Sequence, residues 1–376
     1  MQGYDVIIIG AGTWGAATAW HLADRGVRVL AIDAHTPPHE YGSHGGLTRL
    51  ARQSNSTGPQ YVELTARAFD LWDQLAERTG SELMTVTGNV LIGEPGSSWF
   101  DSTVASLQSS SFEHQVLRGE QARAAFPRLR IADHEMAVFE PQARIAHVPA
   151  CLRAMQQAAR EAGAEFRFDE PVLDWSADAS GVRVRTATGE YAADRLVVTT
   201  GAFSAGVLHL DLPARVDRQV LVTFALPPGA DPLPSIYVAG PAGSDAAPDY
   251  GCMEPDGTWK FSVASNSREI DPTTLSQDVT EEDIAQVTAV LQDRIPEITG
   301  PVVRTTVCMW TEAVDGHWLV GQHPESPRLV IGAACNGRGF RYAPAIGEIL
   351  ADLTGGTARP DLEVFAPTRF TLTSTS

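Results

Sequence analysis

The sequence predicts an α/β fold built from two interleaved domains, one opened by a βαβ unit and one dominated by antiparallel strands. The βαβ unit lies within residues 4–33, and strand patterns dominate between about residues 216 and 310. The length of 376 residues fits roughly two to three domains of ordinary size. Hydrophobic residues make up 43% and charged residues 20% of the chain, which is typical of a folded globular protein.

The βαβ unit is indicated by successive changes of sequence pattern. Residues 5–9 form a short apolar run rich in β-branched side chains, which predicts a buried strand. Residues 10–15 are glycine-rich and predict a tight turn, and residues 14–23 have a helical composition that stops at a glycine. Residues 28–32 predict a second buried strand, directly before Asp33. This order is that of a Rossmann-type unit.

The remaining elements are predicted from helical spacing of apolar residues or from apolar runs bounded by turn residues. Further helices are expected over residues 61–79, 148–163 and 343–354, and further strands over residues 84–93, 195–199, 218–226, 257–265, 302–312 and 328–333. Residues 227–249 are rich in Pro, Gly, Ala and Asp and are expected to form loops. We expect one domain to comprise residues 1–85, 145–215 and 310–376, and the other residues 86–144 and 216–309.

The charge balance excludes some classes of partner. The chain has 28 basic and 46 acidic side chains, a net charge of −18, which argues against binding to nucleic acid or to anionic lipid. Its apolar runs are far shorter than the roughly 20 residues of a membrane span, and no basic region precedes the apolar N-terminal run. The four cysteines include no CxxC pair, as in cytosolic proteins. We therefore expect a cytoplasmic protein with no membrane or nucleic-acid partner.

The turn after the first strand carries a dinucleotide motif. Gly10, Gly12 and Gly15 form G-x-G-x-x-G, and Asp33 follows 18 residues after the last glycine, at the end of the next strand. The glycines allow the backbone to approach a pyrophosphate, which the helix N-terminus attracts, and Asp33 suits ribose hydroxyls. The motif leaves NAD and FAD both open, and an ordinary tight βα turn remains the alternative.

Four further segments carry a family resemblance. They are YGSHGGLTRLAR at residues 41–52, GTWKFSVAS at 257–265, TVCMWTEAVDGHWLVGQHPE at 306–325 and NGRGFRYAPAIGE at 336–348. In this order and spacing they resemble the monomeric sarcosine oxidase family, FAD-dependent amine oxidases that include N-methyltryptophan and pipecolate oxidases. The resemblance spans essentially the whole chain. It implies a Rossmann-type FAD-binding domain with an interleaved antiparallel-sheet substrate domain.

The resemblance implies a covalently bound FAD. In the family, the cysteine that corresponds to Cys308 bonds to the 8-methyl carbon of the flavin; from the residues alone, Cys308 would be a small buried hydrophobe. The other cofactor-binding residues that the resemblance implies, beyond the dinucleotide motif, are Ser43, Thr48, Gly201, Gly337 and Gly339.

The resemblance also implies catalytic and substrate-binding residues. Lys260 corresponds to the lysine that activates oxygen, and a fixed ammonium stabilises the superoxide that forms first; alone, it would be a solvated strand lysine. Arg49 and His44 correspond to residues beside the flavin, although a lone histidine is more often structural. The expected substrate-binding residues are Arg52 and Arg341, which pair with a carboxylate, together with Tyr250 and Trp310.

Two departures from the family pattern bear on the substrate. Ala264 stands where sarcosine oxidase has a histidine, and Trp310 stands where it has a tyrosine. We therefore expect a larger or cyclic amino acid, with molecular oxygen as the second substrate and a monomeric enzyme. The alternatives are an FAD-dependent dehydrogenase or biosynthetic desaturase with another electron acceptor, an NAD-dependent dehydrogenase, and a regulatory nucleotide-binding module.

Overall fold

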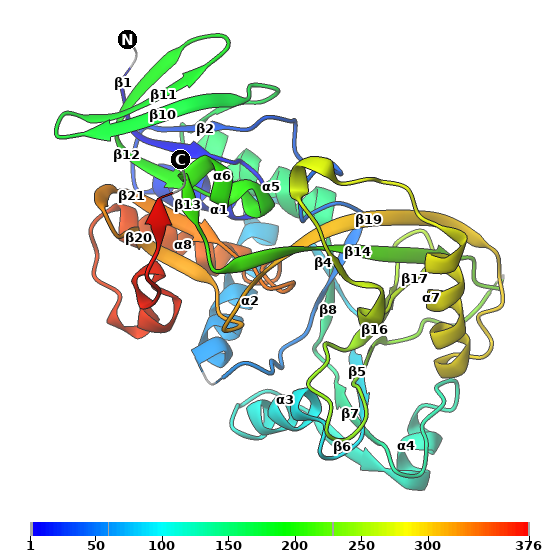
Figure 1. Cartoon of the computed structure of the whole chain (residues 1–376). Coiled ribbons are helices and arrows are strands. Elements are labelled where there is room, and N and C mark those ends of the chain that lie inside the picture. Colours follow the sequence, from blue (N-terminus) through cyan, green and yellow to red (C-terminus); the bar gives the residue numbers. More distant parts are fainter. Residues whose placement is uncertain (1–2, 59, 228, 375–376) are drawn as a thin grey trace.

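The computed structural model describes residues 3–58, 60–227 and 229–374. Two large sheets form the molecule, one at each end of the view in Figure 1, and the long strands β14 (Ala214–Phe224) and β19 (Val302–Ala313) run between them. The end that holds the first sheet is not a continuous stretch of sequence, because blue, green and red segments lie together there.

The first sheet has a parallel centre. Its parallel strands are, in order, β9 (Glu165–Arg167), β2 (Val29–Ile32), β1 (Gly3–Ile9), β12 (Glu190–Val198) and β21 (Ser326–Ala333). Three antiparallel strands extend it: β10 (Val172–Asp178), β11 (Gly181–Thr186) and β20 (Leu319–His323). Strand β1 is buried from Val6 to Ile9, which is why this part of its sequence is a continuous apolar run.

Helices cover one face of this sheet. Helix α1 (Thr13–Asp24) packs against α5 (Val148–Glu161) and α8 (Ala343–Thr354), and α2 (Gln60–Thr79) packs against the latter two. Their contacts depend on small residues: a Cβ at Gly347 of α8 would lie 2.5 Å from the backbone of Ala17 in α1. Close helix packing therefore aims the start of α1 at the carboxyl end of β1.

The second sheet is mainly antiparallel. Its strand order is β18 (Arg268–Glu269), β14, β17 (Trp259–Ser262), β16 (Asp249–Met253), β15 (Ser235–Val238), β5 (Asn89–Gly93), β7 (Met136–Glu140) and β6 (Gln115–Arg118), with β19 on the other edge of β14. Helix α7 (Glu281–Arg294) packs on β14 and β17, α3 (Ser98–Gln108) on β5, and α4 (Gly119–Ala125) on β6 and β7. Buried residues of these elements form a second apolar core.

Smaller elements complete the chain. Strands β3 (Thr48–Ala51), β8 (Arg144–His147) and β4 (Met84–Val86) form a three-stranded sheet, and β13 (Leu210–Asp211) pairs with β22 (Thr373–Ser374) after the short helix α6 (Ser204–Leu208). Among the described residues, none of the helices is both long enough and apolar enough to cross a bilayer.

Three predicted elements differ from the structure. The strand expected over 84–93 is two strands, because a turn with Gly88 at φ +68° separates β4 from β5 and sends them to different sheets. The loop expected over 227–249 contains β15, which pairs in parallel with β5 despite the flanking prolines and glycines. The strand expected over 257–265 ends at Ser262, and a 3-10 turn follows at Ala264–Asn266.

Candidate active site

A cavity of about 560 Å³ lies where the carboxyl ends of the parallel strands meet the second sheet. Of the cofactor-binding, catalytic and substrate-binding residues that the sequence predicted, all except Gly15 line this cavity. The lining includes Gly10, Gly12, Asp33, Ser43, His44, Thr48, Arg49, Arg52, Gly201, Tyr250, Lys260, Cys308, Trp310, Gly337, Gly339 and Arg341. Residues from both ends of the sequence and from its middle therefore form one site.

The dinucleotide motif follows the carboxyl end of β1 and lines one end of the cavity. Gly10 adopts φ +91°, and a Cβ there would lie 2.6 Å from the carbonyl oxygen of Thr199. Asp33 accepts hydrogen bonds from the backbone N–H of Ala11 (2.8 Å) and of His35 (3.0 Å). Gly15 acts in packing, since its Cβ would lie 1.9 Å from the carbonyl oxygen of Gly10. Helix α1 has no side-chain cap, so its N-terminal N–H groups are free to bind phosphate.

His44 lies beside this end of the cavity as a neutral imidazole. Its side chain is buried, and the backbone N–H of His39 donates to its Nε2 (3.4 Å). Burial, together with the nearby His39 and Arg49, lowers the pKa of His44 to about 3. Because Nε2 accepts a hydrogen bond, we assign the proton of the neutral ring to Nδ1. His44 is thus a hydrogen-bond donor without charge.

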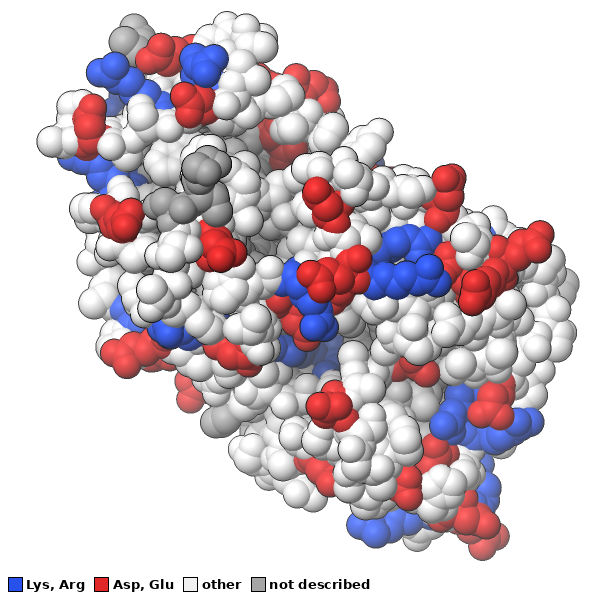
Figure 2. All heavy atoms as spheres, viewed as in Figure 1, with Lys and Arg blue, Asp and Glu red and all other residues white. Residues whose placement is uncertain are grey.

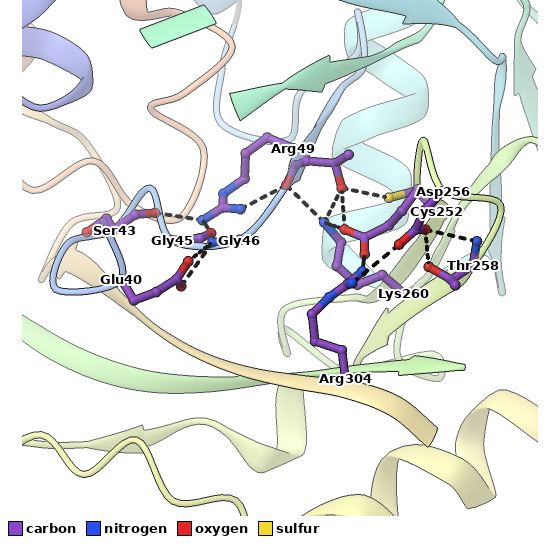
Figure 3. Close-up of polar contacts among 12 residues, drawn as sticks. Glu40, Ser43, Gly45, Gly46, Arg49, Cys252, Asp256, Thr258, Lys260 and Arg304 are labelled. Carbon is purple, nitrogen blue, oxygen red and sulfur yellow. Dashed lines mark hydrogen bonds and ion pairs between the residues drawn. The ribbon is translucent and has the colours of Figure 1, made fainter. Parts of the chain in front are cut away.

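Arg49 lies on β3, and Ser43 lies in the loop that precedes this strand. The Arg49 guanidinium donates to the carbonyl oxygens of Thr48 (2.8 Å), Ser43 (2.8 Å) and Gly45 (2.7 Å), which fixes its direction (Figure 3). Within the described residues no carboxylate forms a salt bridge with Arg49, so its positive charge is uncompensated. The Ser43 hydroxyl is buried and has no hydrogen-bond partner.

Arg52 and Arg341 form a buried pair of cations. Arg341 donates to the backbone carbonyls of Arg52 (2.6 Å) and Ser54 (3.0 Å) and to the Tyr342 hydroxyl (2.9 Å). Arg52 donates to the Ser54 hydroxyl (2.7 Å), and that hydroxyl donates in turn to the buried carboxylate of Glu140 (2.8 Å). Burial, and then the charge of Arg341, lower the pKa of Arg52.

Neither guanidinium has a salt-bridge partner among the described residues, and Nε of Arg341 is buried without a hydrogen bond. Basic side chains on the surface differ in having acidic neighbours, as the face shown in Figure 2 illustrates. Two buried cations with an unpaired N–H are suited to bind a carboxylate.

Aromatic rings form the wall around this pair. The Arg52 guanidinium lies 4.8 Å from the ring centroids of both Trp99 and Tyr237. Tyr237 in turn lies 5.9 Å from Tyr250, and burial raises the pKa of Tyr250. Tyr250 therefore stays a neutral phenol beside the cations.

Cys308 and Trp310 share one face of β19, as their alternating positions predict. Burial raises the pKa of the Cys308 thiol, whereas the charges of Arg49 and Lys260 act in the opposite direction. The Trp310 indole donates to Asp217 (3.1 Å), which leaves only its apolar ring for the cavity. A Cβ at Gly337, where φ is +63°, would lie 2.5 Å from that ring, so this glycine allows Trp310 to pack.

Lys260 projects from β17 towards Thr48 on β3. Its Nζ donates to the carbonyl oxygen of Thr48 (2.9 Å) and to the Thr48 hydroxyl (2.5 Å), and it lies 3.6 Å from a carboxylate oxygen of Glu254 (Figure 3). Lys260 is only 4% exposed, so it is not the solvated strand lysine that the residues alone allow.

Sequence reasoning missed several residues of the site. Trp99 and Tyr237 lie in segments without a motif, and Tyr237 falls within the segment expected to form loops. One available signal was not used: Lys260 is the only lysine in a chain with 28 basic residues. The replacement of a histidine by Ala264 was one reason to expect a larger substrate, but Ala264 does not line the cavity, and its backbone N–H donates to Asp249 (2.8 Å).

Comparison with known proteins identifies the family. Residues 5–353 match the FAD dependent oxidoreductases. The chain is 33% identical to monomeric sarcosine oxidase from Streptomyces avermitilis, over 97% of each chain. It is 30% identical to N-methyl-L-tryptophan oxidase from Yersinia pestis, over 98% of this chain and 99% of the relative. The chain therefore belongs to the family of FAD-dependent oxidoreductases. Within this family it is an amine oxidoreductase similar to sarcosine oxidase, as the sequence motifs predicted.

Solved structures show the same fold. The chain superposes with a TM-score of 0.85 on NikD, an unusual amino acid oxidase essential for nikkomycin biosynthesis, at 24% identity over 98% of each chain. It superposes equally well, at 0.85, on L-proline dehydrogenase from P. horikoshii, at 21% identity over 98% of this chain and 97% of the other. These similarities confirm the predicted fold class.

The residues of the cavity fit FAD. The dinucleotide motif, Asp33 and the free N–H groups of α1 suit the adenosine and pyrophosphate. Buried polar atoms without a partner also lie in lining residues: Ser43 Oγ, Asn336 Nδ2 and Arg341 Nε. An unpaired buried polar atom costs about 1–3 kcal/mol, so the cavity favours a ligand that supplies partners.

Proposed function

We propose that the enzyme oxidises the C–N bond of a secondary or cyclic amino acid to an imine, with molecular oxygen as the electron acceptor. The amine loses two electrons and two protons, and oxygen takes up the same number and leaves as hydrogen peroxide. The observation that carries this proposal is the Arg52–Arg341 pair, which forms no salt bridge within the described residues and lines the cavity that also contains the dinucleotide motif.

In this proposal Arg52 and Arg341 bind the substrate carboxylate and fix the orientation of the amine. The guanidinium of Arg341 is held by two carbonyls and a phenol, so little reorganisation is needed when the carboxylate binds. The rings of Trp99, Tyr237 and Trp310 offer apolar surface to the rest of the substrate, which favours a cyclic or large side chain over a methyl group.

FAD, when bound, accepts the two electrons from the amine and passes them on. Lys260 and Arg49 place positive charge beside the carbonyl oxygen of Thr48, at the wall that also contains Cys308. Their charges stabilise the anion that forms when oxygen receives its first electron. Neutral His44, whose Nε2 accepts a hydrogen bond from His39, would offer its Nδ1–H to the bound cofactor.

Cys308 is the proposed site of covalent attachment. Its buried thiol lines the cavity, and the charges of Arg49 and Lys260 favour the thiolate that has to attack the 8-methyl carbon. The thioether would replace the thiol proton and one methyl hydrogen, and the bound FAD would supply the two-electron acceptor, with molecular oxygen as the final oxidant.

The test is a substrate screen in two parallel formats. Purified holoenzyme is mixed with N-methyl and cyclic amino acids, including sarcosine, proline and pipecolate, while peroxide is measured with a coupled peroxidase. The same compounds are added without oxygen while the flavin absorbance is followed. Bleaching by an amine together with stoichiometric peroxide supports the proposal. Bleaching without peroxide identifies the dehydrogenase or desaturase alternative, and an enzyme that no amine bleaches refutes amine oxidation.

We further propose that the enzyme acts as a cytoplasmic monomer with the domain division expected from the sequence. The four free thiols support a cytoplasmic enzyme, and the similarity to monomeric sarcosine oxidases supports a monomer. Light scattering of the purified protein at several concentrations measures its mass against the 40.3 kDa of one chain.

A further inference from the structure

Glu254 is a buried carboxylate directly behind Lys260. It lies just after β16, is 4% exposed, and places Oε1 3.6 Å from Lys260 Nζ. The same oxygen accepts a hydrogen bond from the Thr48 hydroxyl (3.0 Å), which itself accepts one from the lysine. The ammonium is thus connected to the carboxylate both directly and through one hydroxyl.

The other oxygen of Glu254 faces outward. It is bound by Arg304 of β19, whose side chain is 35% exposed. Figure 3 shows that Arg304 also reaches Asp256, at 3.3 Å. Glu254 does not line the cofactor cavity. Its contacts therefore act on the site only through Lys260 and Thr48.

We propose that Glu254 is a positioning residue that keeps Lys260 protonated and directed at the cavity. The Lys260 side chain is buried near Cys252 and Cys308, and the cation Arg49 donates to the same Thr48 carbonyl oxygen. Among the described residues, Glu254 is the carboxylate within ion-pair distance of its Nζ. Two of its N–H groups donate to Thr48, which leaves the third for Glu254 or a ligand in the cavity. This inference rests on the proposed role of Lys260 towards oxygen.

The composition allows a direct measurement of the lysine. Because Lys260 is the only lysine, protein grown on lysine labelled with ¹⁵N at Nζ gives a single side-chain resonance, whose shift separates ammonium from amine. We compare the holoenzyme with the Glu254→Gln variant, which has nearly the same shape and retains the bond to Thr48. We expect the pH at which the ammonium loses its proton to fall by about 1–3 pH units in this variant.

Asp256→Asn is the matched control, because it removes a nearby carboxylate that contacts Arg304 and not Lys260. Its resonance should titrate as in the unmodified enzyme. Glu254→Asp keeps the charge and should give a smaller shift than Glu254→Gln. If the glutamine variant fails to fold, the titration is measured with Glu254→Asp instead. An unchanged titration in Glu254→Gln, or an equal shift in Asp256→Asn, would overturn the inference.

A second readout separates this inference from the proposed function. Enzyme reduced with dithionite is mixed with oxygen across a range of pH, without any amine. Reoxidation in Glu254→Gln should slow as its ammonium titrates. If the resonance shifts as expected but Lys260→Met reoxidises at the rate of the unmodified enzyme, Glu254 positions Lys260 as inferred. Lys260 then does not assist the reaction with oxygen.

Discussion

Arg49 and Lys260 donate hydrogen bonds to the same acceptor, the carbonyl oxygen of Thr48, at 2.8 and 2.9 Å. Two cations from different sheets are thereby fixed beside each other at the wall of the cavity. Glu254 pairs with Lys260 but is shared with Arg304, and Arg49 forms no salt bridge within the described residues. The site therefore keeps an excess of positive charge where an anion is expected to form.

Lys260→Met should separate the two halves of the reaction. Methionine fills a similar volume without charge, so anaerobic reduction by the best amine of the screen should be retained. Reoxidation by oxygen should slow by about 10²–10³-fold, the usual cost of losing one electrostatic contact to a developing anion. Stopped-flow absorbance measures both rates, with Lys260→Arg as a control that keeps the charge. Equal reoxidation rates in all three proteins would remove Lys260 from the mechanism.

Cys308→Ser should leave FAD binding in place but abolish covalent attachment. The hydroxyl is a far poorer nucleophile than a thiolate, whereas the polar cradle for the dinucleotide is unchanged. After acid precipitation the yellow colour should stay in the pellet of the unmodified enzyme and move to the supernatant of the variant. Cys335→Ser, at the second thiol in the cavity lining, is the control and should keep the colour in the pellet. Release from unmodified, fully loaded enzyme would contradict the thioether.

Arg341→Lys should weaken substrate binding although the charge is kept. A lysine has no planar fork, so it cannot hold the carbonyls of Arg52 and Ser54 and a carboxylate together. Disturbing a buried, hydrogen-bonded charge contact costs about 2–5 kcal/mol, so KM should rise by at least about tenfold, with a smaller change in kcat. Steady-state kinetics with the best amine measures both constants. A matching rise for an amine without a carboxylate would show that the cavity is disturbed in general.

Stability should fall in mildly acidic solution because of buried neutral histidines. Burial lowers the pKa of His21 to about 4, from 6.5 in the unfolded chain. The unfolded state therefore binds more protons below pH 6.5, and the contribution of this group is lost as pH falls from there towards 4. His21→Gln should reduce the loss of unfolding free energy between pH 7 and 5 by up to about 2 kcal/mol. Urea unfolding at both pH values measures this, and an unchanged loss would contradict it.

The βαβ unit and most of the cavity lining were predictable because strong local patterns carry them. Strand β1 ends in the apolar run Val6–Ile9, and Gly10, with a positive φ, follows directly, so backbone geometry and sequence agree there. Cys308 and Trp310 were placed on one face from the strand period alone.

Other parts of the site depend on contacts between distant segments. Glu254 becomes buried because β3 and β19 bring Thr48 and Arg304 to it. The sequence around Glu254 carries no pattern that predicts these contacts. Tyr237 lies on β15, a strand of four residues that is stabilised by pairing with β5 and β16 and is hidden by a loop-like composition.

Gly10 near the start of the chain and Arg341 near its end line the same cavity. During synthesis on the ribosome, the nucleotide motif emerges first, but its walls arrive only with β12, β19 and the turn before α8. Flavin loading consequently has to wait until the turn before α8 has been synthesised, and a product truncated before that turn lacks Gly337, Gly339 and Arg341 from the cavity wall.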